Sequence, residues 1–544
     1  MKVNFYSLCI LLLSYIILYC FFNVWYEDFE TQYEFAVTGY SRLYYFGDFD
    51  FLMNNHLYNI FISLYKWNNS ISWRAYFFSG ITLLCAFLFI RSLLLINVKN
   101  SRKILMFVIT LLLLSNNLIF LNFTRVAMIT VATGWLVVLG FFSIQQFFLR
   151  HALGIFLIVL GSFIRFESSL LASAIVFAMV LFKGGSFMLA SIRNGILPAI
   201  FIVGYFVNIT YTIATSNYYY HLIEPDVEYA INIGEERRVV PLSDMKNKSD
   251  SLRYNFAMYW QVDDSLQINP KFLRSIITYN NKKLRSFNIV ISDFKGYFNE
   301  YGIQNTLLLF VILLVSVYIS FYASNRFALK VFLLFLWFAV LYFLPGLLIR
   351  TEARVQEALI FCFWICWVLL LKDSFLNIKQ IWNPVALIGI YIFVLYSFVM
   401  GFYELKKRSD AHYKAWKRSE INIANLEKNY PNYYIYPYTN ALELFMRPAF
   451  KAGYFSSHFM MTSFAQMSYT PSGKKIIENF YGCNFYDYPC RFQHIKNNKH
   501  QSIFIGGVEL ETLFTDYLAH FYNLDFKLQK QEKLTDELYV YKVL

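Results

Sequence analysis

Long apolar runs dominate this chain, and their length constrains the fold more than any other feature. They recur between residues 5 and 403 and are separated by short polar hinges. A run of roughly 20 apolar residues matches the hydrocarbon thickness of a bilayer. With 58% hydrophobic and only 15% charged residues, the chain has more apolar side chain than a soluble core needs. The sequence therefore predicts an α-helical polytopic membrane protein.

The apolar runs predict about eleven membrane-spanning helices. The first run, 5–24, follows Lys2 and leads into bulky residues without a small-residue cleavage site. We therefore expect a retained anchor with a cytoplasmic N-terminus. The runs at 152–164 and 168–182 are short, and a kinked or partly re-entrant pair is expected there. The other expected spans are 75–96, 104–121, 126–148, 194–213, 305–324, 331–347, 356–371 and 385–403.

Basic residues divide between the two sides that this alternation of spans predicts. The hinges expected in the cytoplasm contain both lysine and arginine, as the positive-inside rule requires. The short outer hinges contain arginine but no lysine. The expected cytoplasmic residues are Lys99, Arg102, Lys103, Arg150, Lys183, Arg193, Arg326, Lys330, Lys372 and Lys379.

The outer hinge arginines are candidates for binding a phosphate group. A guanidinium is a planar fork of donors that binds carboxylate or phosphate through two parallel hydrogen bonds. Glu167 and Glu352 are expected to orient these guanidinium groups. The alternative is that the arginines and acids pair only to hold helix ends at the membrane interface. The candidate phosphate-binding residues are Arg125, Arg165, Arg350 and Arg354.

Three larger segments are expected outside the cytoplasm. Residues 25–73 should form amphipathic helices along the membrane surface, and 214–301 is a polar insert without a catalytic signature. Residues 404–544 have a water-soluble composition and predict a small α/β domain after a membrane module at 1–403. The basic cluster at 406–408 argues for a cytoplasmic tail instead. Long domains translocate largely regardless of charge, so the extracytoplasmic location is retained.

Cysteine positions agree with an outer location of the terminal domain. Five of the seven cysteines lie in apolar spans, where cysteine behaves as a small hydrophobe. Cys483 and Cys490 instead close a short polar loop, and a disulfide is expected between them in an oxidising periplasm. Zinc would need two further ligands, and the nearby His494 does not complete a known spacing.

Several functional classes lack their sequence signatures. The chain has no phosphate-binding loop of the NTPases, no dinucleotide-binding glycine motif, no HExxH and no GxSxG. The net charge of +13 is scattered without a compact basic stripe or a nucleic-acid-binding motif, so no nucleic-acid partner is expected. The second half of the chain does not repeat the first, so a secondary transporter is not favoured.

The first outer segment carries a resemblance to a known enzyme superfamily. Residues 25–30 (WYEDFE), followed by Tyr33, Ala36, Gly47-Asp48 and Asn55-His56, resemble the opening of GT-C-fold glycosyltransferases. The resemblance covers the overall plan and this one motif. It implies a membrane enzyme that takes a sugar from a polyprenyl-phosphate or polyprenyl-diphosphate donor. It also implies that the acidic pair after the first helix, here Glu27 and Asp28, lies at the catalytic centre.

The chain departs from that pattern at His56. In the aminoarabinose- and mannosyl-transferring members the loop continues into a His-Pro-Pro or Lys-Pro-Pro element, whereas Leu57 and Tyr58 follow His56 here. The role of His56 and the type of donor therefore stay open. Glu30 and His56 are retained as residues expected near the substrate.

The chemistry of such a site can be stated from the residues. A hydroxyl acceptor is a weak nucleophile, so a carboxylate must take its proton as the new glycosidic bond forms. Asp28 is the expected base, with Glu27 beside it. The departing polyprenyl phosphate gains negative charge, which the hinge arginines would stabilise. Glu27, Asp28 and Glu30 offer oxygen ligands that suit Mg²⁺ or Mn²⁺, but three acids alone do not establish a metal site.

The sequence thus favours a glycosyltransferase of the bacterial inner membrane with its active site facing the periplasm. Its expected partners are membrane lipids, a lipid-linked sugar donor and a glycan, lipid or protein acceptor. The enzyme alternative is an O-antigen-type polysaccharide polymerase or ligase of the cell envelope. The non-enzyme alternative is a flippase or other transporter of lipid-linked saccharide. Charges that line a cavity through the whole membrane would favour it, whereas here the charges lie at one face.

Overall fold

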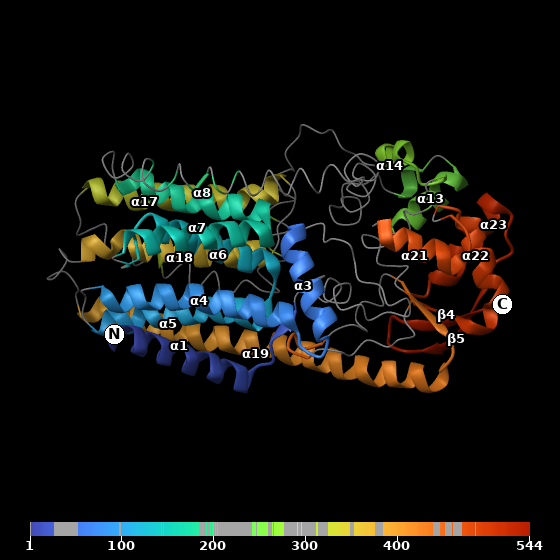
Figure 1. Ribbon diagram of the computed structural model, residues 1–544, viewed down its shortest axis with the longest axis horizontal. Helices are drawn as coiled ribbons and strands as arrows, with labels where there is room; N and C mark the ends of the chain where they lie inside the picture. Colours follow the sequence, from blue (N-terminus) through green and yellow to red (C-terminus); the bar gives the residue numbers. More distant parts are fainter. Residues whose placement is uncertain are drawn as a thin grey trace.

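A computed structural model describes most of the chain. The described ranges are 2–26, 53–96, 100–183, 242–276, 325–348, 353–375, 384–438, 447–451 and 471–544, with short gaps inside several of them and isolated residues between them. A bundle of apolar helices forms one end of the molecule and a small mixed domain forms the other (Figure 1). The long helix α19 (Pro384–Asn429) joins the two parts.

The bundle is built from the apolar runs of the sequence. α3 runs across the ends of the bundle helices rather than alongside them (Figure 1), as expected of an amphipathic helix on a membrane surface. The other helices lie side by side. The bounds are α1 (Lys2–Phe21), α3 (Asn55–Trp67), α4 (Trp73–Leu95), α5 (Asn100–Ile119), α6 (Phe123–Val138), α7 (Phe147–Ile164), α8 (Phe166–Lys183), α17 (Asn325–Leu348) and α18 (Ala353–Phe375).

Three of the described helices are long and apolar enough to cross a membrane, namely Val3–Phe21, Trp73–Leu95 and Phe147–Ile164. Shorter apolar helices lie at Lys103–Ile119, Phe123–Val138, Phe166–Leu181 and Leu329–Leu344. The expected spans 194–213 and 305–324 fall largely outside the described residues. The described chain therefore supports a multi-helix apolar bundle, with far fewer full-length spans than the eleven expected.

The expected single span at 126–148 is wrong. Helix α6 ends at Val138, and the chain turns at Gly140, whose φ of 77° lies in the left-handed region that glycine adopts without strain. Helix α7 then begins at Phe147 and is longer than the short run predicted at 152–164. Helices α7 and α8 are separate elements, because the backbone is extended at Arg165 between them.

Helices α6 and α7 pack closely through glycines. A Cβ atom added at Gly161 would lie 2.5 Å from Val131 Cγ2 and 2.9 Å from the carbonyl oxygen of Ala127. Gly134 and Gly154 make similar approaches, with Gly134 facing the Gly154 carbonyl. Small residues at such positions let two helix backbones approach each other, as in membrane helix pairs.

Substituting Gly161 with Ala is expected to destabilise the bundle by about 1–3 kcal/mol, because the added methyl group overpacks the α6–α7 contact. Gly80→Ala in α4 is the matched control, since no atom lies within 4 Å of the position of its Cβ. That variant should keep or raise stability, by up to about 1 kcal/mol from helix propensity. Thermal unfolding of both purified variants measures the difference, and an unchanged G161A would contradict the close packing.

The expected α/β character of the C-terminal domain is confirmed. Its sheet has the order β3-β4-β6-β5, with β3 parallel to β4 and the remaining pairs antiparallel. The strands are β3 (Tyr434–Pro437), β4 (Ser502–Gly506), β5 (Leu528–Lys533) and β6 (Tyr539–Val543). The helices are α21 (Pro471–Tyr481), α22 (Tyr488–Asn497) and α23 (Leu510–Tyr522), with short 3₁₀ turns at Leu242–Asp244 and Lys499–Gln501.

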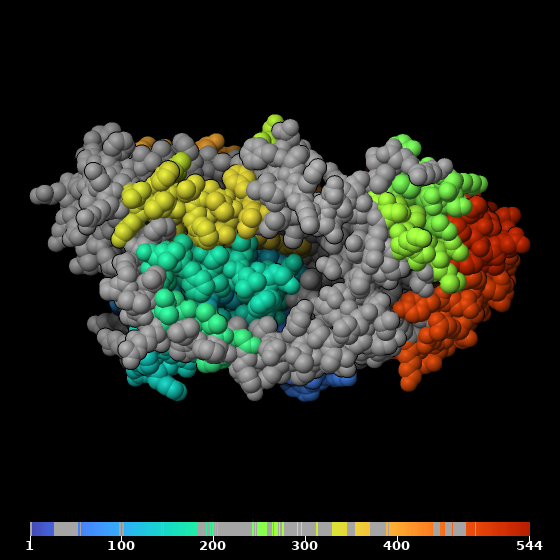
Figure 2. Space-filling view, turned by 90° about the horizontal axis from the view of Figure 1, so that it is seen from above, coloured from blue at the N-terminus to red at the C-terminus, as the bar shows by residue number. Residues whose placement is uncertain are grey.

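Part of the middle insert belongs to this domain. Helices α13 (Lys248–Met258) and α14 (Pro270–Ile276) pack against it, and Figure 2 shows them covering its surface. The Phe256 ring stacks on Tyr517 at 3.7 Å. Asp264 is buried and accepts hydrogen bonds from the hydroxyls of Tyr517, at 2.8 Å, and Tyr522. The terminal domain is therefore completed by residues far from 404–544.

Cys483 and Cys490 both carry free thiols in the structure. Burial and the neighbouring Cys490 raise the pKa of the Cys483 thiol to about 12. A thiol with so high a pKa reacts slowly near neutral pH, because the thiolate is the nucleophile. The disulfide between the two residues stays a prediction.

Candidate functional site

The candidate site lies at the end of the bundle that faces the C-terminal domain. After α1 the chain extends into β1 (Trp25–Tyr26), which pairs in parallel with β2 (Phe120–Leu121) between α5 and α6. On the other edge of β1, the N–H of Ala449 donates to the carbonyl of Val24 at 2.7 Å. The strand that leads into Glu27 and Asp28 is thus held in the middle of this end.

A buried ion-pair network lies beside this small sheet. Glu357, in the second turn of α18, forms ion pairs with Arg125 of α6 and, at 3.5 Å, with Arg408 of α19. Arg125 is fully buried and Glu357 is 2% exposed. Nη1 of Arg125 also donates to the carbonyl oxygens of Asn116 and Phe120, at 3.1 and 3.0 Å. Three helices are therefore tied together by one carboxylate.

Local structure explains how Arg125 reaches this position. The side chain of Asn122 accepts a hydrogen bond from the N–H of Thr124 at 2.8 Å and caps the N-terminus of α6. Arg125 therefore lies in the first helical turn, next to β2. The carbonyls that it binds end α5 and start β2, so the guanidinium replaces hydrogen bonds that a helix end leaves unmade.

Arg408 forms the more accessible side of the network. Its guanidinium lies 4.1 Å from the centre of the Phe120 ring, and its side chain is 12% exposed. One turn further along α19, His412 lies against the rings of Trp25 and Phe120. The indole N–H of Trp25 donates to Ser409 at 3.1 Å. Helix α19 thus holds β1 through the contacts of Ser409 and His412 with Trp25.

Burial, and secondarily the charge of Arg408, lower the pKa of His412 from 6.5 to about 4. The folded protein therefore holds His412 neutral, while the unfolded chain takes up a proton as the pH falls below about 6.5. The free energy of folding that neutral His412 contributes is therefore fully present above about pH 6.5 and is lost as the pH falls towards about 4.

At pH 5 this loss of folding free energy is expected to reach up to about 2 kcal/mol. Tm measured at pH 7 and pH 5 should fall less in His412→Asn than in the wild type, and equal falls would contradict this account.

Besides Arg125, two more of the expected phosphate-binding arginines, Arg165 and Arg354, are described. Nη1 of Arg165 donates to Oγ1 of Thr124 at 2.8 Å, and its guanidinium lies 4.8 Å from the Phe123 ring centre. Its expected pairing with Glu167 is present at 3.7 Å, but Glu167 is 72% exposed. Arg354 lies buried in the first turn of α18, three residues before Glu357. Both therefore lie at the same end as Arg125.

Other expected site residues lie partly outside the described chain. Glu27, Asp28, Glu30, Arg350 and Glu352 are not among the described residues. His56 is exposed in the first turn of α3, and the N–H of Asn54 donates to the carbonyl of Phe163 at 2.7 Å. That bond attaches the start of α3 to the bundle end. Among the described residues, no group of three acids, histidines or cysteines could hold a metal ion.

The sequence analysis missed Glu357 and Arg408. Glu357 falls inside the expected span 356–371, and an acid within an apolar run is itself a sign of a functional or paired group. Arg408 was grouped with Lys406 and Lys407 as a basic flank. Its pairing with Glu357 separates it from those lysines, which pair locally with Asp410 and Glu404.

Charged groups are distributed unequally between the two bundle ends. The described lysines of the expected cytoplasmic hinges, including Lys103, Lys183 and Lys330, lie at the opposite end, where α5 and α17 start and α8 ends. The buried charged side chains of the described bundle lie at the candidate-site end, near the starts of α4, α6 and α18. They are Arg74, Arg125, Arg354 and Glu357.

Comparison with known proteins yields no matching family model, no matching curated protein and no matching solved structure.

Proposed function

We propose that this protein is a glycosyltransferase of the GT-C type, embedded in the bacterial inner membrane, with its active site at the described bundle end facing the periplasm. Its donor would be a sugar linked to a polyprenyl phosphate. The observation that carries the proposal is the buried Arg125–Glu357–Arg408 network beside the strand that leads directly to Glu27 and Asp28.

The charge of this network suits a phosphate-bearing donor. Among the described residues, one carboxylate is shared by the guanidinium groups of Arg125 and Arg408, so this described part carries more positive than negative charge. Arg165 and Arg354 lie at the same end. Buried charges are costly and are retained where they are paired or used. Arg165 and Arg408 keep some exposure and could contact a phosphate. Arg125 is fully buried, so we assign it to positioning Glu357 rather than to direct phosphate contact.

The proposed reaction uses few groups. Asp28 would take the proton of the acceptor hydroxyl while the hydroxyl oxygen bonds to the anomeric carbon of the sugar. The bond from that carbon to the phosphate oxygen breaks, and its electron pair stays on the departing polyprenyl phosphate. The guanidinium groups would stabilise this charge, which is larger in the transition state than in the bound donor.

The location of the charges favours an enzyme over a flippase. A transporter of a charged saccharide needs polar groups along a path through the membrane. The buried charges of the described bundle instead lie at one end. An O-antigen-type polymerase or ligase remains the enzyme alternative, and the early acidic pair together with the terminal α/β domain favours the GT-C type over it.

The Arg165→Lys variant tests whether this end binds a phosphate. Lysine keeps the charge but loses the planar fork, so affinity for a polyprenyl phosphate should fall by about ten- to a hundredfold. Arg150→Lys, in the first turn of α7 at the opposite bundle end, is the matched control and should bind normally. Binding is measured by titrating the full chain in detergent. If R165K binds polyprenyl phosphate as tightly as the wild type, Arg165 only holds the helix ends and does not bind the phosphate.

A further inference from the structure

The second half of α19 carries a row of basic side chains on its outward surface. Lys407, Lys414 and Arg418 are exposed and lie seven and four residues apart, which places them on one side of a helix. Lys406 and Lys417 flank them. We call these five residues the α19 basic stripe. Among the described residues, Lys414 and Arg418 have no acidic partner.

The stripe begins where α19 leaves the bundle. Arg408 and Ser409 contact Glu357 and Trp25 at the bundle end, so Lys406 and Lys407 lie at that level. With a rise of 1.5 Å per residue, Arg418 lies about 16 Å further along the axis. A headgroup layer of roughly 5–8 Å and a Debye length of about 8 Å together span about 13–16 Å. Lys407 and Lys414 lie within this range, and Arg418 lies at its upper limit. Figure 1 shows this part of α19 along the outer edge of the molecule.

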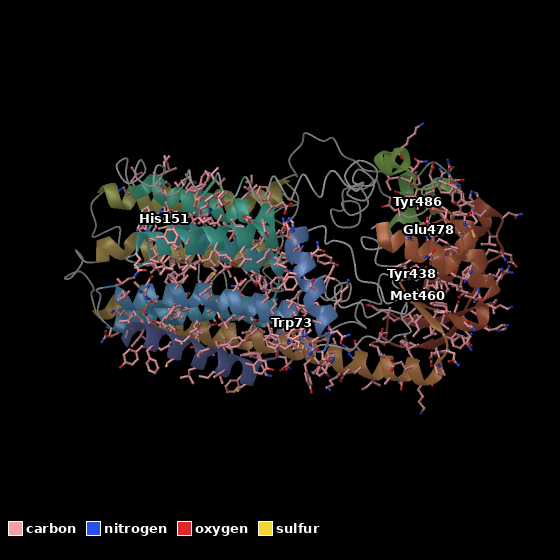
Figure 3. The ribbon with its side chains drawn as sticks, in the orientation of Figure 1. Trp73, His151, Tyr438, Met460, Glu478 and Tyr486 are labelled. Carbon is pink, nitrogen blue, oxygen red and sulfur yellow. The ribbon has the colours of Figure 1, made fainter. Side chains whose placement is uncertain are left out.

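Aromatic side chains mark the same level. Tyr403 is 62% exposed just before the stripe. The rings of Tyr19 and Tyr76 pack against the Phe450 ring, with 6.1 and 4.9 Å between the ring centres. The ring of Trp73, labelled at the bundle end in Figure 3, stacks on exposed Trp67. Tyrosine and tryptophan concentrate at membrane–water interfaces, so this belt indicates where a headgroup layer would lie.

We propose that the α19 basic stripe binds the headgroups of anionic phospholipids in the leaflet at the bundle end. The inference rests on the proposed function, because it assumes that the bundle lies in a membrane. Lys406 pairs with Asp410 at 2.7 Å and Lys407 with Glu404 at 4.0 Å, with both lysines more than half exposed. Such exposed pairs contribute little and can be exchanged for a lipid phosphate. The stripe holds α19, and Arg408 with it, at a fixed depth.

The test compares two lipids on the full chain in detergent. Fluorescent phosphatidylglycerol should bind more tightly than fluorescent phosphatidylcholine. The triple variant Lys407→Gln, Lys414→Gln and Arg418→Gln should weaken phosphatidylglycerol binding about a hundredfold, at about fivefold per charge, and leave phosphatidylcholine unchanged. The matched control replaces three exposed lysines of the terminal domain, Lys499, Lys527 and Lys530, with Gln and should bind both lipids normally.

The proposal is overturned if both lipids bind equally tightly. It is also overturned if the control triple variant weakens phosphatidylglycerol binding as much as the stripe variant does. Displacement of phosphatidylglycerol by millimolar inorganic phosphate would also overturn it, because the site would then recognise a free anion. If circular dichroism shows that the triple variant is unfolded, Lys414→Gln alone should give about a fivefold loss. Alkaline carbonate extraction separates the two proposals: release of the chain from membranes overturns both, whereas retention without lipid preference overturns only the stripe.

Discussion

Replacing Glu357 with Gln is expected to lower the free energy of unfolding by about 3–5 kcal/mol. The substitution removes the carboxylate charge that pairs with Arg125 and Arg408, and so takes the Glu357 counter-charge away from the buried guanidinium of Arg125. Hydrogen bonds to the Asn116 and Phe120 carbonyls cannot offset that charge in a low-dielectric interior. The measurement is thermal unfolding of the purified chain in detergent, together with the yield of monodisperse protein.

Two further variants show whether the effect belongs to the network. Glu167→Gln removes an exposed acid 3.7 Å from Arg165 and should change stability by about 0.5 kcal/mol or less. The triple variant Arg125→Met, Glu357→Leu and Arg408→Met removes all three charges together and should recover much of the stability. It should not recover activity if the network serves the donor. An E357Q protein as stable as the wild type would contradict the buried pairing.

Asp28→Asn is expected to reduce sugar transfer by about 10²- to 10⁴-fold, because the amide keeps the shape of the side chain and loses its basicity. Glu27→Gln should have a milder effect. Transfer is measured in proteoliposomes with a panel of polyprenyl-phosphate-linked sugars and candidate acceptors.

Asp410→Asn is the matched control, since Asp410 is half exposed and pairs only with Lys406 among the described residues. It should transfer at close to the wild-type rate. The Tm of the Asp28 variant should also stay near that of the wild type. If Asp28→Asn keeps activity within a few-fold, Asp28 is not the base.

Much of the helical architecture follows from the sequence. The apolar runs give α1, α4, α5, α8, α17 and α18 with bounds close to those observed, because hydrophobic periodicity reports local structure. The boundary between α6 and α7 was missed, since one glycine with positive φ divides a run that is apolar throughout. The length of α19 was also missed. Its polar half continues as helix to Asn429 after the apolar run ends.

The candidate site was only partly predictable. Because successive spans cross the membrane in opposite directions, the hinge arginines could be assigned to one end of the bundle. The described Arg125, Arg165 and Arg354 do lie together there. The pairing of Glu357 with Arg125 and Arg408 joins three helices distant in sequence, and such contacts leave no local pattern. The shared core of α13 and the terminal domain was missed for the same reason.

The central claim is that a polyprenyl phosphate binds at the bundle end that holds Arg125, Glu357 and Arg408. Photo-crosslinking with a diazirine-bearing polyprenyl phosphate, followed by peptide mapping of the full chain, tests this location directly. The account predicts labelled peptides from 120–125, 163–167 and 353–357, with labelling suppressed by excess polyprenyl phosphate but not by polyprenol. Labelling at the opposite end, around 100–103 or 147–150, or equal suppression by polyprenol, would contradict it.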